Sequence, residues 1–229
     1  MSDSVNLEFN LKKYKEIIES NKTAKLLAVS KTKPNADILK AYNLGQIDFG
    51  ENKVQELLQK SIDLSKSCPH ILWHFIGKLQ SNKINQLLKV EGLVSIHSID
   101  SIKLLNKLLS KNIDKKIGLF LQVNTSLEDE KSGFENMDEI LQGIQLINSH
   151  KDFYFQGLMT IGRIRTEDFT KSAHECFSKL VELKEEILIK GLVQNLELSM
   201  GMSSDYEIAL SYKSDWIRIG SALFGQRGL

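Results

Sequence analysis

Apolar residues along the chain alternate between short continuous runs and longer stretches with helical spacing. Leu7, Leu11, Tyr14 and Ile17 recur every three or four residues, which predicts an amphipathic helix near the start of the chain. Eight short apolar runs come next, and a segment with helical spacing follows each of them. We expect these runs to be strands, at residues 25–29, 47–49, 72–76, 93–97, 117–123, 154–160, 196–199 and 216–219.

The order of these elements indicates the fold class. The run at 25–29 reads Lys-Leu-Leu-Ala-Val, without the alternation of a half-exposed strand, and this is typical of parallel strands buried on both faces. Eight strand–helix pairs favour an α/β protein with a single (β/α)8 TIM barrel and an extra N-terminal helix. The alternative is an open doubly wound sheet. In that fold a glycine-rich turn that binds a dinucleotide is expected after the first strand. This chain has Ser30-Lys31-Thr32-Lys33 there instead.

Composition narrows the class of function. The 229 residues contain 30 Lys+Arg and 29 Asp+Glu, so no basic field favours nucleic acid or a membrane surface. Cys68 and Cys176 lie far apart and form neither a disulfide framework nor a metal-binding spacing. The chain also lacks a signal-peptide pattern and an apolar run long enough to span a bilayer. We therefore expect one cytoplasmic domain over residues 1–229, monomeric, with a small-molecule ligand.

The residue that follows the first strand is the first candidate for chemistry. Functional groups of a barrel lie past the C-terminal ends of its strands, and Lys31 occupies that position. One interpretation is an ordinary lysine in water at the rim. The other is a desolvated amine with a lowered pKa, which suits Schiff-base formation. Lys33 is expected to be solvated.

Two loops near the end of the chain carry glycines and hydroxyls. Residues 199–205 read Ser-Met-Gly-Met-Ser-Ser-Asp, and residues 218–221 read Arg-Ile-Gly-Ser. Such turns bind anions through free backbone N–H groups, although Ser203, Ser204 or Asp205 also suit plain helix capping. The loops after strands seven and eight form the usual phosphate site of barrel enzymes, and closure sets strand eight about 5 Å from strand one. Together with Lys31 they predict a site for an aldehyde phosphate, either pyridoxal 5′-phosphate or a sugar phosphate.

A metal site is not expected. His70 and His74 resemble a ligand pair, but in a strand they would lie about 13 Å apart, too far to share an ion. The chain also lacks the phosphate loop of nucleotide-binding proteins and the nucleophile elbow of hydrolases.

Several motifs identify a family resemblance over essentially the whole chain. They occur in order at residues 27–34 (LAVSKTKP), 49–52 (FGEN), 74–83 (HFIGKLQSNK), 157–159 (GLM), 198–205 (LSMGMSSD) and 218–227 (RIGSALFGQR). Together they resemble the pyridoxal phosphate homeostasis protein family. The departures are Lys53, where an aromatic residue or arginine is frequent, and Gly162, where proline is frequent.

This resemblance implies a cofactor and its ligands. The implied fold is a single barrel like the N-terminal domain of alanine racemase, with pyridoxal 5′-phosphate held as a Schiff base on Lys31. Arg218 is expected to face the pyridine nitrogen, and Asn52 and Met159 to line the ring. The phosphate is expected at Ser199, Gly201, Gly220 and Ser221.

The resemblance also implies binding without turnover. Arginine only donates hydrogen bonds, so Arg218 would keep the ring nitrogen unprotonated and weaken the cofactor as an electron sink. Racemases of this design take a second base from another domain, and we expect no such domain within the few residues after Ile219. The expected function is therefore a non-enzymatic carrier or buffer in vitamin B6 and amino-acid homeostasis, with pyridoxal-phosphate-dependent apoenzymes as candidate partners. The alternative is an alanine-racemase-like amino-acid racemase.

Overall fold

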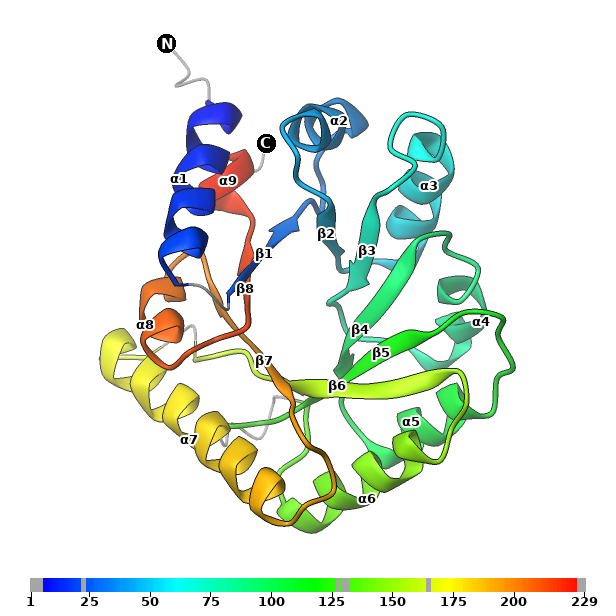
Figure 1. Ribbon diagram of the computed structural model, residues 1–229, viewed down its shortest axis with the longest axis vertical. Coiled ribbons are helices and arrows are strands. Elements are labelled where there is room, and N and C mark those ends of the chain that lie inside the picture. The colour runs from blue at the N-terminus through cyan, green and yellow to red at the C-terminus, as the bar shows by residue number, and fades with distance from the viewer. Residues whose placement is uncertain (1–5, 22–23, 127, 129–131, 164–165, 226–229) are drawn as a thin grey trace.

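The strands of the protein close into a parallel barrel. A computed structural model describes residues 6–21, 24–126, 128, 132–163 and 166–225. Within them each strand pairs in parallel with the next, and the last pairs with the first (Figure 1). The strands are β1 (Lys25–Val29), β2 (Asp48–Glu51), β3 (Leu72–Phe75), β4 (Leu93–Ile99), β5 (Ile117–Gln122), β6 (Phe153–Met159), β7 (Glu197–Met202) and β8 (Trp216–Ile219). This confirms the predicted (β/α)8 TIM barrel and excludes the open sheet.

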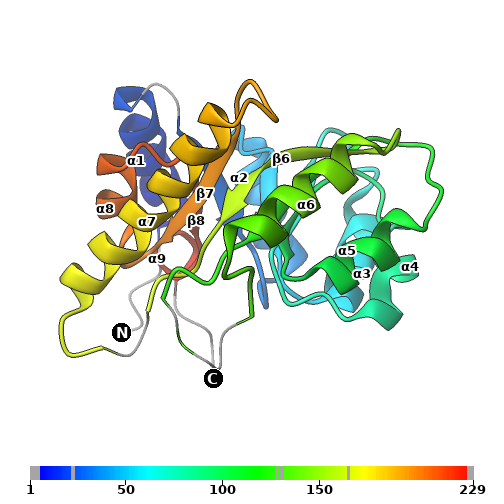
Figure 2. The same cartoon turned by 90° about the horizontal axis from the view of Figure 1, so that it is seen from below.

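Helices surround the barrel, and at least one follows every strand (Figures 1 and 2). They are α1 (Leu7–Ser20), α2 (Asn35–Asn43), α3 (Val54–Leu64), α4 (Ile84–Leu87), α5 (Ile102–Leu109), α6 (Met137–Asn148), α7 (Phe169–Ile189), α8 (Tyr206–Ser211) and α9 (Ser221–Phe224), with a 3-10 turn at Ser81–Lys83. The extra helix α1 precedes the barrel and packs beside α9, so the first and last helices lie together.

Three strands run past the C-terminal ends that the apolar pattern predicts. Strand β4 continues through Ser98 to Ile99. Strand β2 runs on through Gly50 and Glu51, where the apolar pattern stops. Strand β7 continues past Ser199 to Met202, with a register shift against β8. Gly201 permits this because it has a φ of +91°, a conformation that L side chains rarely adopt. The prediction that β7 ends at Ser199 is therefore wrong, and the loop after β7 begins three residues later.

The barrel interior is partly apolar and partly polar. The large core lies between strands and helices, whereas a small cluster of Leu27, Phe120, Met159 and Trp216 lies apart from it. The ring of His97 stacks on Phe120, with ring centroids 4.2 Å apart, so polar groups share this space. Buried polar groups require hydrogen-bond partners, which makes the polar part of the interior informative about function.

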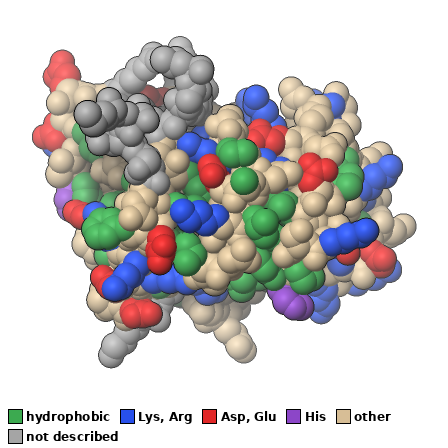
Figure 3. All heavy atoms as spheres, turned by 90° about the horizontal axis from the view of Figure 1, so that it is seen from above, with side chains coloured by type: hydrophobic (Ala, Val, Ile, Leu, Met, Phe, Trp, Pro, Cys, Tyr) green, Lys and Arg blue, Asp and Glu red, His purple; other side chains and the backbone are tan. Residues whose placement is uncertain are grey.

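The surface carries charges of both signs. On the face drawn in Figure 3, Lys and Arg side chains are interspersed with Asp and Glu rather than gathered in one field. Among the described helices, none combines the length and the apolar character that crossing a bilayer requires.

Candidate functional site

Barrel closure brings the two ends of the chain to one cavity. In the β1–β8 pair, Leu27 lies opposite Arg218 and Ala28 opposite Ile219. The residues that follow these two strands consequently meet at the C-terminal end of the barrel. They contribute to the wall of a cavity of about 610 Å³, together with the loop after β7. The lining residues are Val29, Lys31, Thr32, Lys33, Ile76, Met202, Ser203, Ser204, Arg218, Gly220, Ser221, Ala222 and Gly225.

The chemistry of this lining suits an anion with an apolar part. Lys31, Lys33 and Arg218 supply positive charge, and no described lining residue is an acid or a histidine. Serine hydroxyls come from both the β7 and the β8 loop, while Val29 and Ile76 supply apolar surface. An anionic acceptor would bind to this lining more strongly than a neutral one, because charge-assisted hydrogen bonds are stronger than neutral ones.

Lys33 holds the cavity rim together. Its ammonium group donates to the carbonyls of Phe224 and Gly225, at 3.1 and 3.0 Å. These contacts fasten the loop after β1 to the end of α9. The expectation of a solvated Lys33 is therefore wrong, because its ammonium group donates to carbonyls at the end of a helix.

Ser203 joins the two loops that bear hydroxyls. Its Oγ accepts from the backbone N–H groups of Gly220 and Ala222, both at 3.4 Å, so it bridges from the β7 loop to the β8 loop. Asp205 is the N-cap residue of α8, but its carboxylate accepts from the N–H of Met202, at 2.5 Å, and makes no side-chain cap. The 203–205 segment thus shapes the cavity, and helix capping does not explain it.

Arg218 points into the barrel and forms the floor of the cavity. One of its terminal nitrogens donates to the carbonyl and the hydroxyl of Ser199, at 2.7 and 2.9 Å, and the other donates to the carbonyl of Thr160, at 2.8 Å. Burial lowers its pKa to about 10 although nearby Asp205 opposes the shift, so the guanidinium stays charged at neutral pH. Three of its five N–H groups are thereby used within the described part of the chain. The other two have no acceptor among the described residues.

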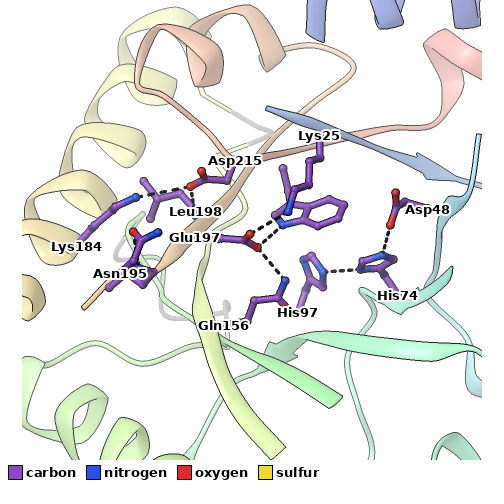
Figure 4. A network of polar contacts seen from close by, with 12 residues as sticks. Lys25, Asp48, His74, His97, Gln156, Lys184, Asn195, Glu197, Leu198 and Asp215 are labelled. Carbon is purple, nitrogen blue, oxygen red and sulfur yellow. Dashed lines mark hydrogen bonds and ion pairs between the residues drawn. The ribbon is translucent and has the colours of Figure 1, made fainter. Parts of the chain in front are cut away.

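A hydrogen-bond chain runs from Arg218 through the barrel to its opposite end. The Ser199 hydroxyl contacts His97 Nδ1 at 2.9 Å. His97 Nε2 contacts His74 Nδ1 at 3.1 Å, and His74 Nε2 contacts the Asp48 carboxylate at 3.0 Å (Figure 4). Burial holds the pKa of His97 well below its ordinary value, and His74 and Arg218 lower it further. Arginine only donates and a carboxylate only accepts. Arg218 therefore donates to Ser199 at one end of this chain, and His74 Nε2 donates to Asp48 at the other.

The N-terminal end of the barrel is closed by polar side chains. The carboxylate of Glu197 accepts from Lys25 at 3.0 Å, from Gln156 at 2.8 Å and from the indole N–H of Trp216 at 2.7 Å (Figure 4). Burial alone would raise the pKa of Glu197, but these hydrogen bonds lower it. The Lys25 ammonium group also lies 4.7 Å from the centroid of the Trp216 ring. The cavity at the other end is therefore the candidate site.

The structure brings together half of the residues predicted for the site. Lys31, Arg218, Gly220 and Ser221 line the cavity. The other four lie behind or beside it. Ser199 is fully buried beneath the cavity, held by Arg218 and His97.

Gly201 also lies behind the wall. A Cβ at this position would come within 2.5 Å of the Ala209 Cβ on α8. Its lack of a side chain therefore lets β7 approach α8, and a phosphate contact at the Gly201 backbone stays a prediction. Met159 belongs to the small apolar cluster, which Ile76 of the cavity wall covers. Asn52 has a buried amide oxygen without a hydrogen-bond partner among the described residues.

The sequence interpretation missed two features of the site. Ser203 and Ser204 stood in a recognised motif, but helix capping explained them equally well there. The role of His97 gave no local signal, because its partners His74 and Ser199 lie 23 and 102 residues away. A search of the strands for polar residues at interior positions would have found it, since a buried polar group implies a partner.

Comparisons with known proteins agree with this geometry. The sequence profile of the alanine racemase N-terminal domain matches residues 2–228. The pyridoxal phosphate homeostasis protein of Mus musculus is 41% identical over 211 residues, which cover 89% of this chain and 77% of the relative. That of Haemophilus influenzae is 35% identical over 236 residues and covers 97% of both chains.

Solved structures give the same result. PipY of Synechococcus elongatus, in the structure with PLP bound, superposes with a TM-score of 0.85 at 30% identity, covering 96% of this chain and all of that one. Alanine racemase from E. faecalis superposes at 0.73 with 18% identity and 58% of its length covered, a likeness of fold alone. The barrel is thus of the alanine racemase N-terminal type. Within that class, the chain belongs to the pyridoxal phosphate homeostasis protein family.

Proposed function

We propose that this protein is a single barrel domain that binds pyridoxal 5′-phosphate and holds it through Lys31. The observation that carries the proposal is one cavity lined by a primary amine, a buried guanidinium and the hydroxyls of two loops. The donor set fits the ligand, because it offers hydrogen bonds and positive charge to a phosphate and an amine to an aldehyde. The relatives named above, and PipY with PLP bound, support the same ligand.

Each part of the lining has a proposed task. Ser203, Ser204, Ser221 and the backbone at Gly220 hold the phosphate, and the three hydroxyls take the place predicted for Ser199. Lys31 would hold the aldehyde as a Schiff base, in which the neutral amine gives up both its hydrogens and the aldehyde oxygen leaves with them as water. The two remaining N–H groups of Arg218 face the ring nitrogen, while Asn52 and Met159 stand along the ring.

The same lining favours storage over turnover. When bound, the cofactor supplies an electron sink, and this sink is strongest with a protonated ring nitrogen. Arg218 cannot accept a proton from that nitrogen or give one up at neutral pH, because its pKa is about 10. Nor does the described lining contain a carboxylate, histidine or tyrosine to act as a second base. We therefore propose a carrier that buffers the cofactor for vitamin B6 and amino-acid homeostasis, in the cytoplasm, as a monomer, with apoenzymes as acceptors.

Borohydride reduction tests the attachment. The purified protein with pyridoxal 5′-phosphate is expected to absorb visible light, to lose this band on reduction, and to keep the label on the peptide that contains Lys31. Lys31→Ala removes both signals. A label on another lysine, or no uptake of the compound by the wild-type protein, contradicts the proposal.

A racemase is the second candidate because the fold is that of alanine racemase. Exchange of the α-proton in deuterated water separates the two functions. A carrier incubated with a panel of amino acids leaves the α-proton in place over hours. Sustained exchange at enzyme-like rates, abolished by Lys31→Ala, overturns the carrier assignment.

A further inference from the structure

The residues on both sides of Lys31 are held by a buried ionic cluster on β2 and α3. Lys60 of α3 donates to the Ser30 carbonyl at 2.8 Å, to Glu51 Oε1 at 2.8 Å and to Glu56 Oε1 at 2.7 Å. These three bonds account for all three ammonium hydrogens. We call Lys60, Glu51 and Glu56 the lysine clamp.

The lysine clamp binds the residue before Lys31 and the residue after it. On one side, the Ser30 hydroxyl donates to Glu51 Oε1 at 2.7 Å, in addition to the bond between the Ser30 carbonyl and Lys60. On the other side, the Thr32 N–H donates to Glu56 Oε1 at 2.6 Å. The backbone before and after Lys31 is thus fixed by side chains of one cluster.

The turn that the clamp holds is a strained one. Thr32 has a φ of 65°, in the left-handed region that β-branched residues rarely occupy. Such a conformation is unfavourable and persists only where the surroundings impose it. The bond from Thr32 to Glu56 is one such constraint, and it lies one residue from the amine that faces the cavity.

Keeping the clamp buried has a cost in free energy. The side chains of Lys60 and Glu51 are 7% and 0% exposed. Glu51 Oε2 has no hydrogen-bond partner among the described residues, and burial raises the pKa of Glu51 although Lys60 opposes this. A buried ion pair often stabilises a fold no better than apolar side chains of the same volume. Stability alone is therefore a weak explanation for this cluster.

We infer that the lysine clamp positions Lys31 for covalent capture of an aldehyde, an inference that rests on the proposed attachment of pyridoxal 5′-phosphate to Lys31. Lys60, Glu51 and Glu56 do not line the cavity, so they act through the backbone of Ser30 and Thr32. Ser203, Ser204 and Ser221 recognise the phosphate from the opposite side, independently of the clamp. The clamp thus governs the covalent part of binding and leaves phosphate recognition unchanged.

The test compares pyridoxal 5′-phosphate with pyridoxine 5′-phosphate, in which an alcohol replaces the aldehyde. Glu56→Ala removes the contact to Thr32 at a side chain that is 22% exposed. It is expected to lower affinity for the aldehyde about tenfold, or about 1.4 kcal/mol, and to leave affinity for the alcohol within about twofold. Glu186→Ala removes a similar i,i+4 pair with Lys190 on α7 and changes neither affinity.

Two further variants keep the outcome decisive. Lys60→Arg retains a donor and is expected to restore part of the aldehyde preference that Lys60→Met loses. In a Lys31→Ala background, Glu56→Ala should have no further effect on either compound, because the clamp acts only through Lys31. If Glu56→Ala lowers affinity equally for both compounds, or leaves affinity for the aldehyde unchanged, the inferred role of the lysine clamp is overturned. Failure of wild-type protein to prefer the aldehyde overturns the proposed function instead.

Discussion

Arg218 and Ser199 are joined by two hydrogen bonds, from one guanidinium nitrogen to the carbonyl and the hydroxyl of the serine, at 2.7 and 2.9 Å. Both residues are buried, and the serine hydroxyl continues into the histidine chain. Ser199 therefore supports the guanidinium, and we propose that other hydroxyls of the cavity hold the phosphate.

Phosphate recognition is predicted to depend on Ser203 and Ser221. Charge-assisted hydrogen bonds contribute about 1.5–3 kcal/mol each, so the Ser203→Ala/Ser221→Ala double variant should retain pyridoxal 5′-phosphate at least tenfold less well. Competition by inorganic phosphate measures this directly. Ser199→Ala is the comparison, and it should leave competition by inorganic phosphate within about threefold of wild type. The reverse pattern would restore the original assignment to Ser199.

The stability of the barrel is predicted to depend on the Ser199 hydroxyl. Ser199→Ala leaves His97 Nδ1 buried without its hydrogen-bond partner, which costs about 1–3 kcal/mol of unfolding free energy. Urea denaturation gives this difference. Ser95→Ala is a matched control, because the Ser95 hydroxyl is equally buried but has no hydrogen-bond partner among the described residues. Equal losses in the two variants would show that the Ser199 hydroxyl makes no specific contribution.

His97 is predicted to make stability depend on pH. Its folded pKa lies well below the ordinary value of about 6.5, so below pH 6.5 the unfolded chain binds a proton that the folded protein excludes. The unfolding free energy should be greatest above pH 6.5 and fall by up to about 1.4 kcal/mol per pH unit between pH 6.5 and 5. His97→Gln should flatten this slope. Parallel curves for the two proteins would assign the slope to other groups.

Gly77→Ala tests the packing beside Asn52. A Cβ at Gly77 would lie 2.1 Å from the Asn52 carbonyl oxygen, so backbone must move, and overpacking of this kind costs about 1–3 kcal/mol. Thermal unfolding should report the loss, accompanied by weaker pyridoxal 5′-phosphate binding if Asn52 stands along the ring. Among the described residues, a Cβ at Gly162 would meet the Asp205 carboxylate at 3.4 Å, an ordinary contact distance, so Gly162→Ala is the control. Normal stability in Gly77→Ala would contradict this packing.

The barrel and the meeting of Lys31 with the β8 loop could be predicted because they follow from local patterns and closure. An unbroken apolar run such as 25–29 implies a parallel strand, and closure then sets the first strand beside the last. Which serines of the β7 segment line the cavity could not be predicted, because this depends on how far β7 extends past Gly201. The histidine chain and the lysine clamp were likewise out of reach, because they link different strands and helices by contacts without a sequence pattern.

The pairing of β8 with β1 sets the time at which the site can exist. During synthesis Lys31 is translated early, whereas the serines of the β7 and β8 loops are translated late. These serines lie near Lys31 only after β8 has paired with β1. Chains interrupted before β8 possess a lysine without an anion pocket. Binding of the vitamin at the proposed site therefore requires that β8 has already paired with β1.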